Sequence, residues 1–154
     1  MRRSERRETL FRLLFMRQFH ADEECAEQIT HYIENVRGGL EDIPADGMIS
    51  REEEEEIRRR LDEIVARIPE IDERLNRVAR GWKTSRMSKV DLNILRLASY
   101  EILFDEEVPT GVAINEAVEI AKKYGGGETS VFVNGILGQI AKETAAGESA
   151  ETDR

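Results

Sequence analysis

The stretch SKVDLNILRLASYEILF, residues 88–104, is apolar around most of a helix. Its apolar residues follow helical spacing and point in most directions from the helix axis: Val90, Leu92, Ile94, Leu95, Leu97, Ala98, Ile102, Leu103 and Phe104. A helix that is apolar nearly all round is usually surrounded by other helices. We therefore expect this segment to be the central helix of an all-α fold.

Apolar residues follow helical spacing on both sides of this segment. Gly38–Gly39 and Gly125–Gly126–Gly127 are expected to end helices, and Pro69 to stop one helix and begin the next. The region from Gly38 to Gly47 is expected to be a loop. With the central segment, the pattern predicts seven helices, including residues 3–19, 50–68, 69–82, 112–124 and 129–142.

Three details of these helices can be predicted from single residues. Ser50 and Ser88 are placed to cap the helices that follow them, with Glu53 and Asp91 three residues on. The helix over residues 69–82 is expected to use Ile71, Leu75, Val78 and Trp82 as its apolar residues. Gly135 and Gly138 cost helix stability, so we expect a neighbouring backbone to approach them closely.

Charge is distributed unevenly along the 154 residues. The net charge is -9, which argues against a protein that coats nucleic acid or anionic membranes indiscriminately. Residues 2–17 nevertheless contain six arginines against only Glu5 and Glu8, a balance of +4. An acidic body with one basic end indicates a local anionic partner.

The basic end consists of Arg2, Arg3, Arg6 and Arg7, which pair at i,i+4 on one helical stripe. Cations at a helix N-terminus oppose the helix dipole, and an external anion would offset that cost. The planar guanidinium group suits phosphate because it donates two parallel hydrogen bonds. From the arginine run alone, a solvated, frayed terminus is the favoured explanation, since such runs are common and weakly specific.

The sequence contains no motif that requires an enzyme, a metal or a cofactor. Nucleophile elbows and phosphate-binding loops are absent, and Cys25, His20 and His31 lack metal-ligand spacing. Cys25 is the only cysteine, which favours a reducing compartment, and no apolar run is long enough to span a bilayer. We expect a cytoplasmic binding protein with no membrane partner.

Three motifs in the second half resemble the NusB family. VDLNILRLASYE (residues 90–101) resembles the central helix of that family, and residues 108–122 match its P-x-x-V-A-I-N-E-A segment. FVNGIL (residues 132–137) matches its F-V-N-G signature. The first half is similar more loosely, through the basic start that leads into LFRLLF (residues 10–15).

The resemblance implies two packed helical bundles, about residues 1–68 and 69–145, which together form an RNA-binding domain. The small, polar residues 146–154 are expected to be a disordered tail. For function, it implies a transcription antitermination factor that binds single-stranded boxA RNA together with NusE, a ribosomal small-subunit protein. The pair would join an RNA polymerase antitermination complex and support ribosomal RNA transcription.

The resemblance also implies site residues. RNA would be bound by the basic start and by residues near the last two helices: Arg2, Arg3, Arg6, Arg7, Phe132, Asn134, Lys122 and Lys123. Contacts with the partner are implied for Phe15, Asp91 and Glu128. Each of the last group has another explanation or a departure: Phe15 replaces a frequent tyrosine, while Asp91 and Glu128 suit helix starts. Phe132 is as consistent with a core aromatic as with a base-stacking one.

Two other classes of function fit parts of the pattern. NusB-like domains also precede the catalytic domain of some ribosomal RNA cytosine methyltransferases. Because few residues follow the helical region, we expect a free-standing protein instead. The second alternative is a helical protein–protein adaptor without RNA activity, whose arginines bind an acidic protein.

Overall fold

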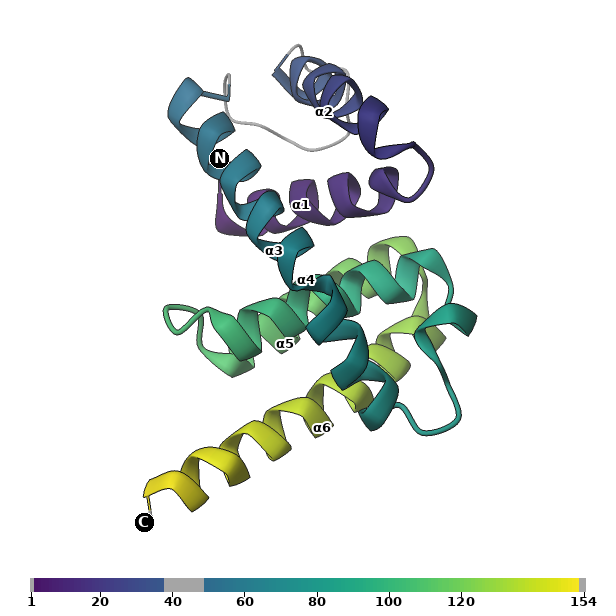
Figure 1. Cartoon of the computed structure of the whole chain (residues 1–154), viewed down its shortest axis with the longest axis vertical. Coiled ribbons are helices and arrows are strands. Elements are labelled where there is room, and N and C mark those ends of the chain that lie inside the picture. Colours follow the sequence, from purple (N-terminus) through teal and green to yellow (C-terminus); the bar gives the residue numbers. More distant parts are fainter. Residues whose placement is uncertain (1, 38–48, 153–154) are drawn as a thin grey trace. The chain divides into compact units, whose positions relative to one another are not determined.

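The computed structural model describes residues 2–37 and 49–152, with the side chains of Asp22, Arg37 and residues 146–152 left out. The expected loop from Gly38 to Gly47 lies outside these residues. Within the described ranges the chain is all-α, as predicted (Figure 1). The helices are α1 (Arg3–Arg17), α2 (Asp22–Arg37), α3 (Arg51–Val78), α4 (Lys89–Phe104), α5 (Thr110–Tyr124) and α6 (Gly127–Thr152), with a 3-10 turn, η1 (Thr84–Arg86).

The chain divides into two compact units, an N-terminal unit (Met1–Ala66) and a C-terminal unit (Arg67–Arg154). The two bundles that the family resemblance implies, about residues 1–68 and 69–145, stay a prediction. α3 belongs to both units. None of the described helices is long and apolar enough to cross a membrane.

α3 is one helix where the sequence predicts two, because Pro69 lies inside it. A proline in a helix interior loses one backbone hydrogen bond and costs about 3 kcal/mol. The apolar stripe continues across it at helical spacing, and Ile64, Ile71 and Leu75 are fully buried. Burial of an aliphatic side chain stabilises by roughly 1.5–3 kcal/mol, so three such side chains outweigh the proline. The described residues therefore form six α-helices, close to the predicted seven.

α4 is the central helix of the C-terminal unit, as predicted. Residues 92–101 are all buried, and α4, α5 and α6 pack against one another. Ser88 caps the helix, since its Oγ accepts a hydrogen bond from the backbone N–H of Asp91 at 3.1 Å.

A two-pronged ion pair links α4 to α3 in this unit. Arg96 donates from Nε to Oδ1 of Asp72 at 2.9 Å and from Nη2 to Oδ2 at 2.7 Å. The side chains of Arg96 and Asp72 are only 11% and 22% exposed. A paired, low-exposure guanidinium of this kind keeps its charge satisfied inside the helical packing.

The turn between α5 and α6 is formed by Gly125 and Gly126, which end α5 as predicted. Gly126 has φ +85°, a left-handed conformation that glycine adopts without steric cost. α6 runs on to Thr152, ten residues beyond its predicted end at Lys142. The disorder expected for residues 146–154 stays a prediction.

Gly135 and Gly138 lie inside α6, but not for the reason expected from the sequence. A methyl group added at either position would meet no atom within 4 Å, and both residues are exposed. The expectation that a neighbouring backbone of this chain approaches them is therefore wrong for the described residues.

The core of the N-terminal unit is built from all three of its helices. α1 contributes Leu10, Phe11, Leu13 and Leu14, α2 contributes Tyr32, Ile33 and Val36, and α3 contributes Ile57, Leu61 and Ile64. α3 begins at the expected cap, because the N–H of Glu53 donates to Ser50 Oγ at 3.1 Å.

Candidate nucleic-acid interface

The start of α1 is organised by Glu5, the acidic residue within the arginine run. Its carboxylate accepts a hydrogen bond from the backbone N–H of Arg2 at 3.2 Å and lies 3.9 Å from the Nε of Arg2. Glu5 is only 8% exposed. A carboxylate in the first turn satisfies a free backbone donor and complements the helix dipole. Glu5 therefore fixes the first turn from which Arg2 and Arg3 extend.

The four arginines of this run differ in exposure. Arg2 and Arg3 are exposed, whereas Arg6 and Arg7 are half-buried. Nη1 of Arg6 donates to Oε1 of Glu56 in α3 at 2.7 Å, and its side chain is only 28% exposed. The basic end that faces solvent is thus the first turn of α1. Arg6, by contrast, is paired with a carboxylate of the same chain.

Phe15, a predicted partner contact, lies in a row of three aromatic rings along α1. Its ring centroid is 6.2 Å from that of Phe11 and 5.0 Å from that of Phe19. Phe11 is fully buried, Phe15 is half-buried and Phe19 is exposed. The row therefore leads from the core of the N-terminal unit to its surface.

In the C-terminal unit, Phe132 is neither a core side chain nor a free one. It is half-buried and meets Trp82 edge to face, with ring centroids 6.0 Å apart and planes at 67°. Asn134, two residues further along α6, is exposed. The contact with Trp82 shows that Phe132 is partly packed, and its stacking on an RNA base stays a prediction.

The remaining predicted residues lie at helix ends of the same unit. Lys122 and Lys123 are exposed in the last turn of α5, and Glu128 is exposed in the first turn of α6. Lys122 lies 3.6 Å from Glu119 in an exposed ion pair, which is worth little in water. Asp91 is half-buried in the first turn of α4, where its backbone N–H donates to Ser88 Oγ; a role for its carboxylate stays a prediction.

The predicted RNA-binding residues thus form two groups. The first turns of α1 place Arg2, Arg3, Arg6 and Arg7 in the N-terminal unit. The α5–α6 turn region places Lys122, Lys123, Phe132 and Asn134 in the C-terminal unit. Each group lies within one unit.

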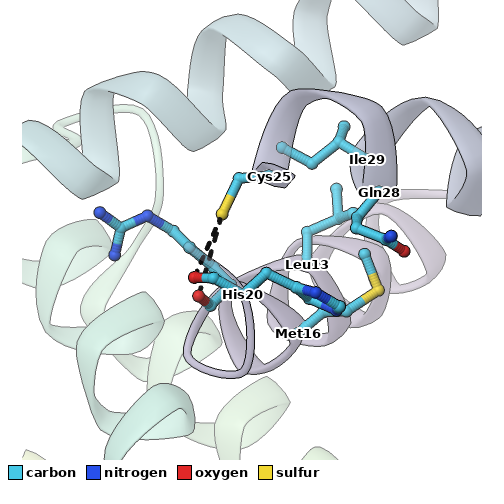
Figure 2. Close-up of a pocket in the computed structure, with 7 residues that line it drawn as sticks. Leu13, Met16, His20, Cys25, Gln28 and Ile29 are labelled. Atoms are coloured by element: carbon cyan, nitrogen blue, oxygen red, sulfur yellow. Dashed lines mark hydrogen bonds between the residues drawn. The ribbon is translucent and has the colours of Figure 1, made fainter. Parts of the chain in front are cut away.

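The cysteine and one of the histidines have structural roles in the N-terminal unit (Figure 2). The Sγ of Cys25 lies 3.8 Å from the carbonyl oxygen of His20 and 3.9 Å from that of Arg17. Cys25, His20 and Arg17 line a shallow pocket together with Leu13, Met16, Gln28 and Ile29. This pocket encloses no space that fits a water molecule. No group of three potential metal ligands occurs among the described residues.

Sequence reasoning missed Trp82. The helical pattern assigns it to an apolar stripe, but α3 ends at Val78 and Trp82 is 58% exposed. Gly81, with φ +84°, turns the chain just before it. The warning in the sequence is Gly81 itself, because glycine favours the end of a helix.

Comparison with known proteins identifies the family. The model of the NusB family matches residues 4–142. The chain belongs to the NusB family. It is similar to the transcription antitermination protein NusB of Lachnoclostridium phytofermentans, with 47% identity over 140 residues, 91% of this chain and 98% of the relative.

Solved NusB structures share the fold. The T. maritima NusB structure matches with a TM-score of 0.74 and 39% identity, covering 93% of this chain and 92% of that one. A chain from the crystal structure of antitermination factors NusB and NusE in complex with dsRNA matches with a TM-score of 0.73. It is 24% identical and covers 92% of this chain and 96% of its own length. Membership of the NusB family, a binding and not a catalytic family, agrees with the expectation that the chain is no enzyme.

Proposed function

We propose that this NusB-family protein is a transcription antitermination factor that binds boxA RNA together with NusE and supports ribosomal RNA transcription in the cytoplasm. The observation that carries the proposal is the exposed pair Arg2–Arg3 at a fixed helix start, in a chain with net charge -9. The similarity to NusB proteins named for transcription antitermination supports it.

The charge distribution gives RNA a small set of contacts on the protein. Affinity for single-stranded RNA depends on phosphate contacts and on bases that stack on aromatic rings. The first turn of α1 offers guanidinium groups, and Phe132 offers part of an aromatic ring. Since the chain outside residues 2–17 carries a net negative charge, we expect the protein alone to bind RNA weakly.

A second protein completes the RNA-binding surface in this proposal. NusE is the expected partner, and Phe15, Asp91 and Glu128 are its expected contacts on this chain. The exposed end of the Phe11–Phe15–Phe19 row supplies an apolar contact of the kind enriched in protein interfaces. The resulting pair would enter an antitermination complex on RNA polymerase.

Fluorescence anisotropy of a labelled boxA RNA, with NusE present, tests the proposal. The wild-type protein should bind boxA RNA more tightly than the same nucleotides in permuted order. The double variant Arg2→Ala/Arg3→Ala should bind more weakly, and its slope of log affinity against log salt should flatten by about 1.4, the value for two lost phosphate contacts to single-stranded RNA.

Arg59→Ala is the matched control, because Arg59 is an exposed arginine in the same unit but outside the arginine run. It should leave the salt slope unchanged. If neither RNA binds while an acidic partner protein does, the adaptor alternative replaces this proposal.

A further inference from the structure

The residues around the connection between α3 and α4 carry a local excess of positive charge. Residues 77–89, here called the basic connector, contain five exposed cations and no acidic residue: Arg77, Arg80, Lys83, Arg86 and Lys89. The connector therefore carries +5 in a chain whose net charge is -9. Such a local excess attracts polyanions despite the acidic remainder.

Most of these cations are not used inside the protein. Within the described part of the chain, no ion pair is formed by Arg77, Arg80, Lys83 or Arg86. By contrast, Arg74, just before the connector, pairs with Glu143 at 3.5 Å. The charges of these four connector residues are thus available for an external anion.

An aromatic ring lies in the middle of this charge. Trp82 is flanked by Arg80 and Lys83 and keeps 58% of its surface exposed. Its edge-to-face contact with Phe132 orients the ring without covering it. A base that stacks on an exposed aromatic ring contributes about 1–3 kcal/mol to binding.

The connector is held in one conformation, which fixes the positions of these side chains. The N–H of Thr84 donates to Oδ1 of Asn76 at 2.8 Å, and the N–H of Trp82 donates to the carbonyl of Ala79 at 2.8 Å. Met87, directly after η1, is buried. A ligand would therefore meet a preformed surface and lose less conformational entropy on binding.

We infer that the basic connector is a single-stranded RNA contact, in which a base stacks on Trp82 and phosphates lie against Lys83 and Arg86. Charge complementarity favours RNA over an apolar or acidic protein segment, and the aromatic ring favours unpaired bases over a duplex. The inference rests on the proposed function and adds a contact to it, next to the predicted Phe132.

The intrinsic fluorescence of the protein tests this inference, because Trp82 is its only tryptophan. A short single-stranded boxA RNA should quench the emission as it binds, with the same midpoint as the anisotropy of a labelled copy of that RNA. NusE is present in both titrations, with any tryptophan of its own changed to phenylalanine.

Substitutions complete the test. Trp82→Ala should lower RNA affinity about ten-fold, within the range expected for one lost stack, and Trp82→Phe should restore most of it. Lys83→Glu or Arg86→Glu should each weaken binding several-fold. Lys142→Glu, the same charge change at an exposed position about 15 Å from Phe132 along α6, should have little effect. Circular dichroism identifies any variant that fails to fold, and for such a variant the quenching of the wild type decides.

The outcomes distinguish this inference from the proposed function. RNA that binds by anisotropy without quenching Trp82, and with equal affinity for Trp82→Ala, overturns the inference alone. Quenching by NusE in the absence of RNA also overturns it, because the connector would then dock protein. Failure of the wild type to bind any RNA overturns the proposed function and the inference together.

Discussion

The Nη1 atom of Arg6 in α1 lies 2.7 Å from Oε1 of Glu56 in α3, so an internal carboxylate already holds one of the predicted RNA-binding arginines. In the proposed function, an RNA phosphate and Glu56 would compete for the same guanidinium group. The pair also joins two helices of the N-terminal unit, which gives Arg6 a structural role besides any contact with RNA.

Glu56→Gln should release Arg6 with little damage to the fold. The pair is partly exposed, so its loss should cost less than about 1 kcal/mol in the free energy of unfolding, measured in urea. RNA affinity should rise, because the competing carboxylate is gone. Arg6→Ala should lower both stability and RNA affinity. A Glu56→Gln protein that binds RNA more weakly than the wild type would show that Arg6 acts only within the fold.

The ion pair between Arg96 and Asp72 should matter more for stability. Asp72→Asn leaves a low-exposure guanidinium without its countercharge, and we expect a loss of roughly 2–4 kcal/mol in urea unfolding. Glu70→Gln is the control, since it removes the exposed partner of Arg67 in the same helix. It should cost under about 1 kcal/mol. Similar losses for both variants would show that the Arg96–Asp72 pair contributes no more to stability than an exposed ion pair.

The two interior glycines of α6 should be replaceable with a gain in stability. Since open space surrounds both positions, Gly135→Ala and Gly138→Ala should each raise the free energy of unfolding by about 0.5–1 kcal/mol. Thermal unfolding of the single variants checks this. A destabilised alanine variant would mean that a neighbouring part of this chain does approach the glycine.

The end of α6 should contribute little to the stability of the protein. Ile140 is the last buried side chain of α6 up to residue 145, so no described apolar contact holds the later turns. Amides beyond residue 145 should exchange with solvent within the fastest class, and removal of residues 146–154 should leave thermal unfolding unchanged. Slow exchange in this segment would instead show that the tail is ordered, against the prediction from the sequence.

The parts of the fold that follow from local rules could be predicted from the sequence. The apolar pattern of residues 88–104 identified α4, Ser88 and Ser50 marked helix starts, and Gly126 marked the end of α5. Each of these depends on the residue itself and on neighbours within a turn or two. The resemblance to the NusB family was also confirmed. It depends on three short motifs, each of which can be read from neighbouring residues.

The features that were missed depend on contacts between distant parts of the chain. Pro69 stays inside α3 because buried side chains on both sides of it outweigh its local cost. Arg6 is paired with a residue fifty positions away, and no local pattern indicates that carboxylate. Trp82 is exposed because α3 ends before it, and the ring that it contacts, Phe132, lies in another helix. The sequence alone shows the positive charge of the basic connector, but not that Trp82 within it is exposed.

RNA affinity with and without the partner protein tests whether a second protein completes the RNA-binding surface. We would measure binding of labelled boxA RNA by anisotropy, first with this protein alone and then with saturating NusE at the same salt concentration. We expect this protein alone to bind the RNA weakly. Its affinity should rise at least about ten-fold, or 1.4 kcal/mol, when NusE is added. Equal affinity in the two titrations would contradict this expectation.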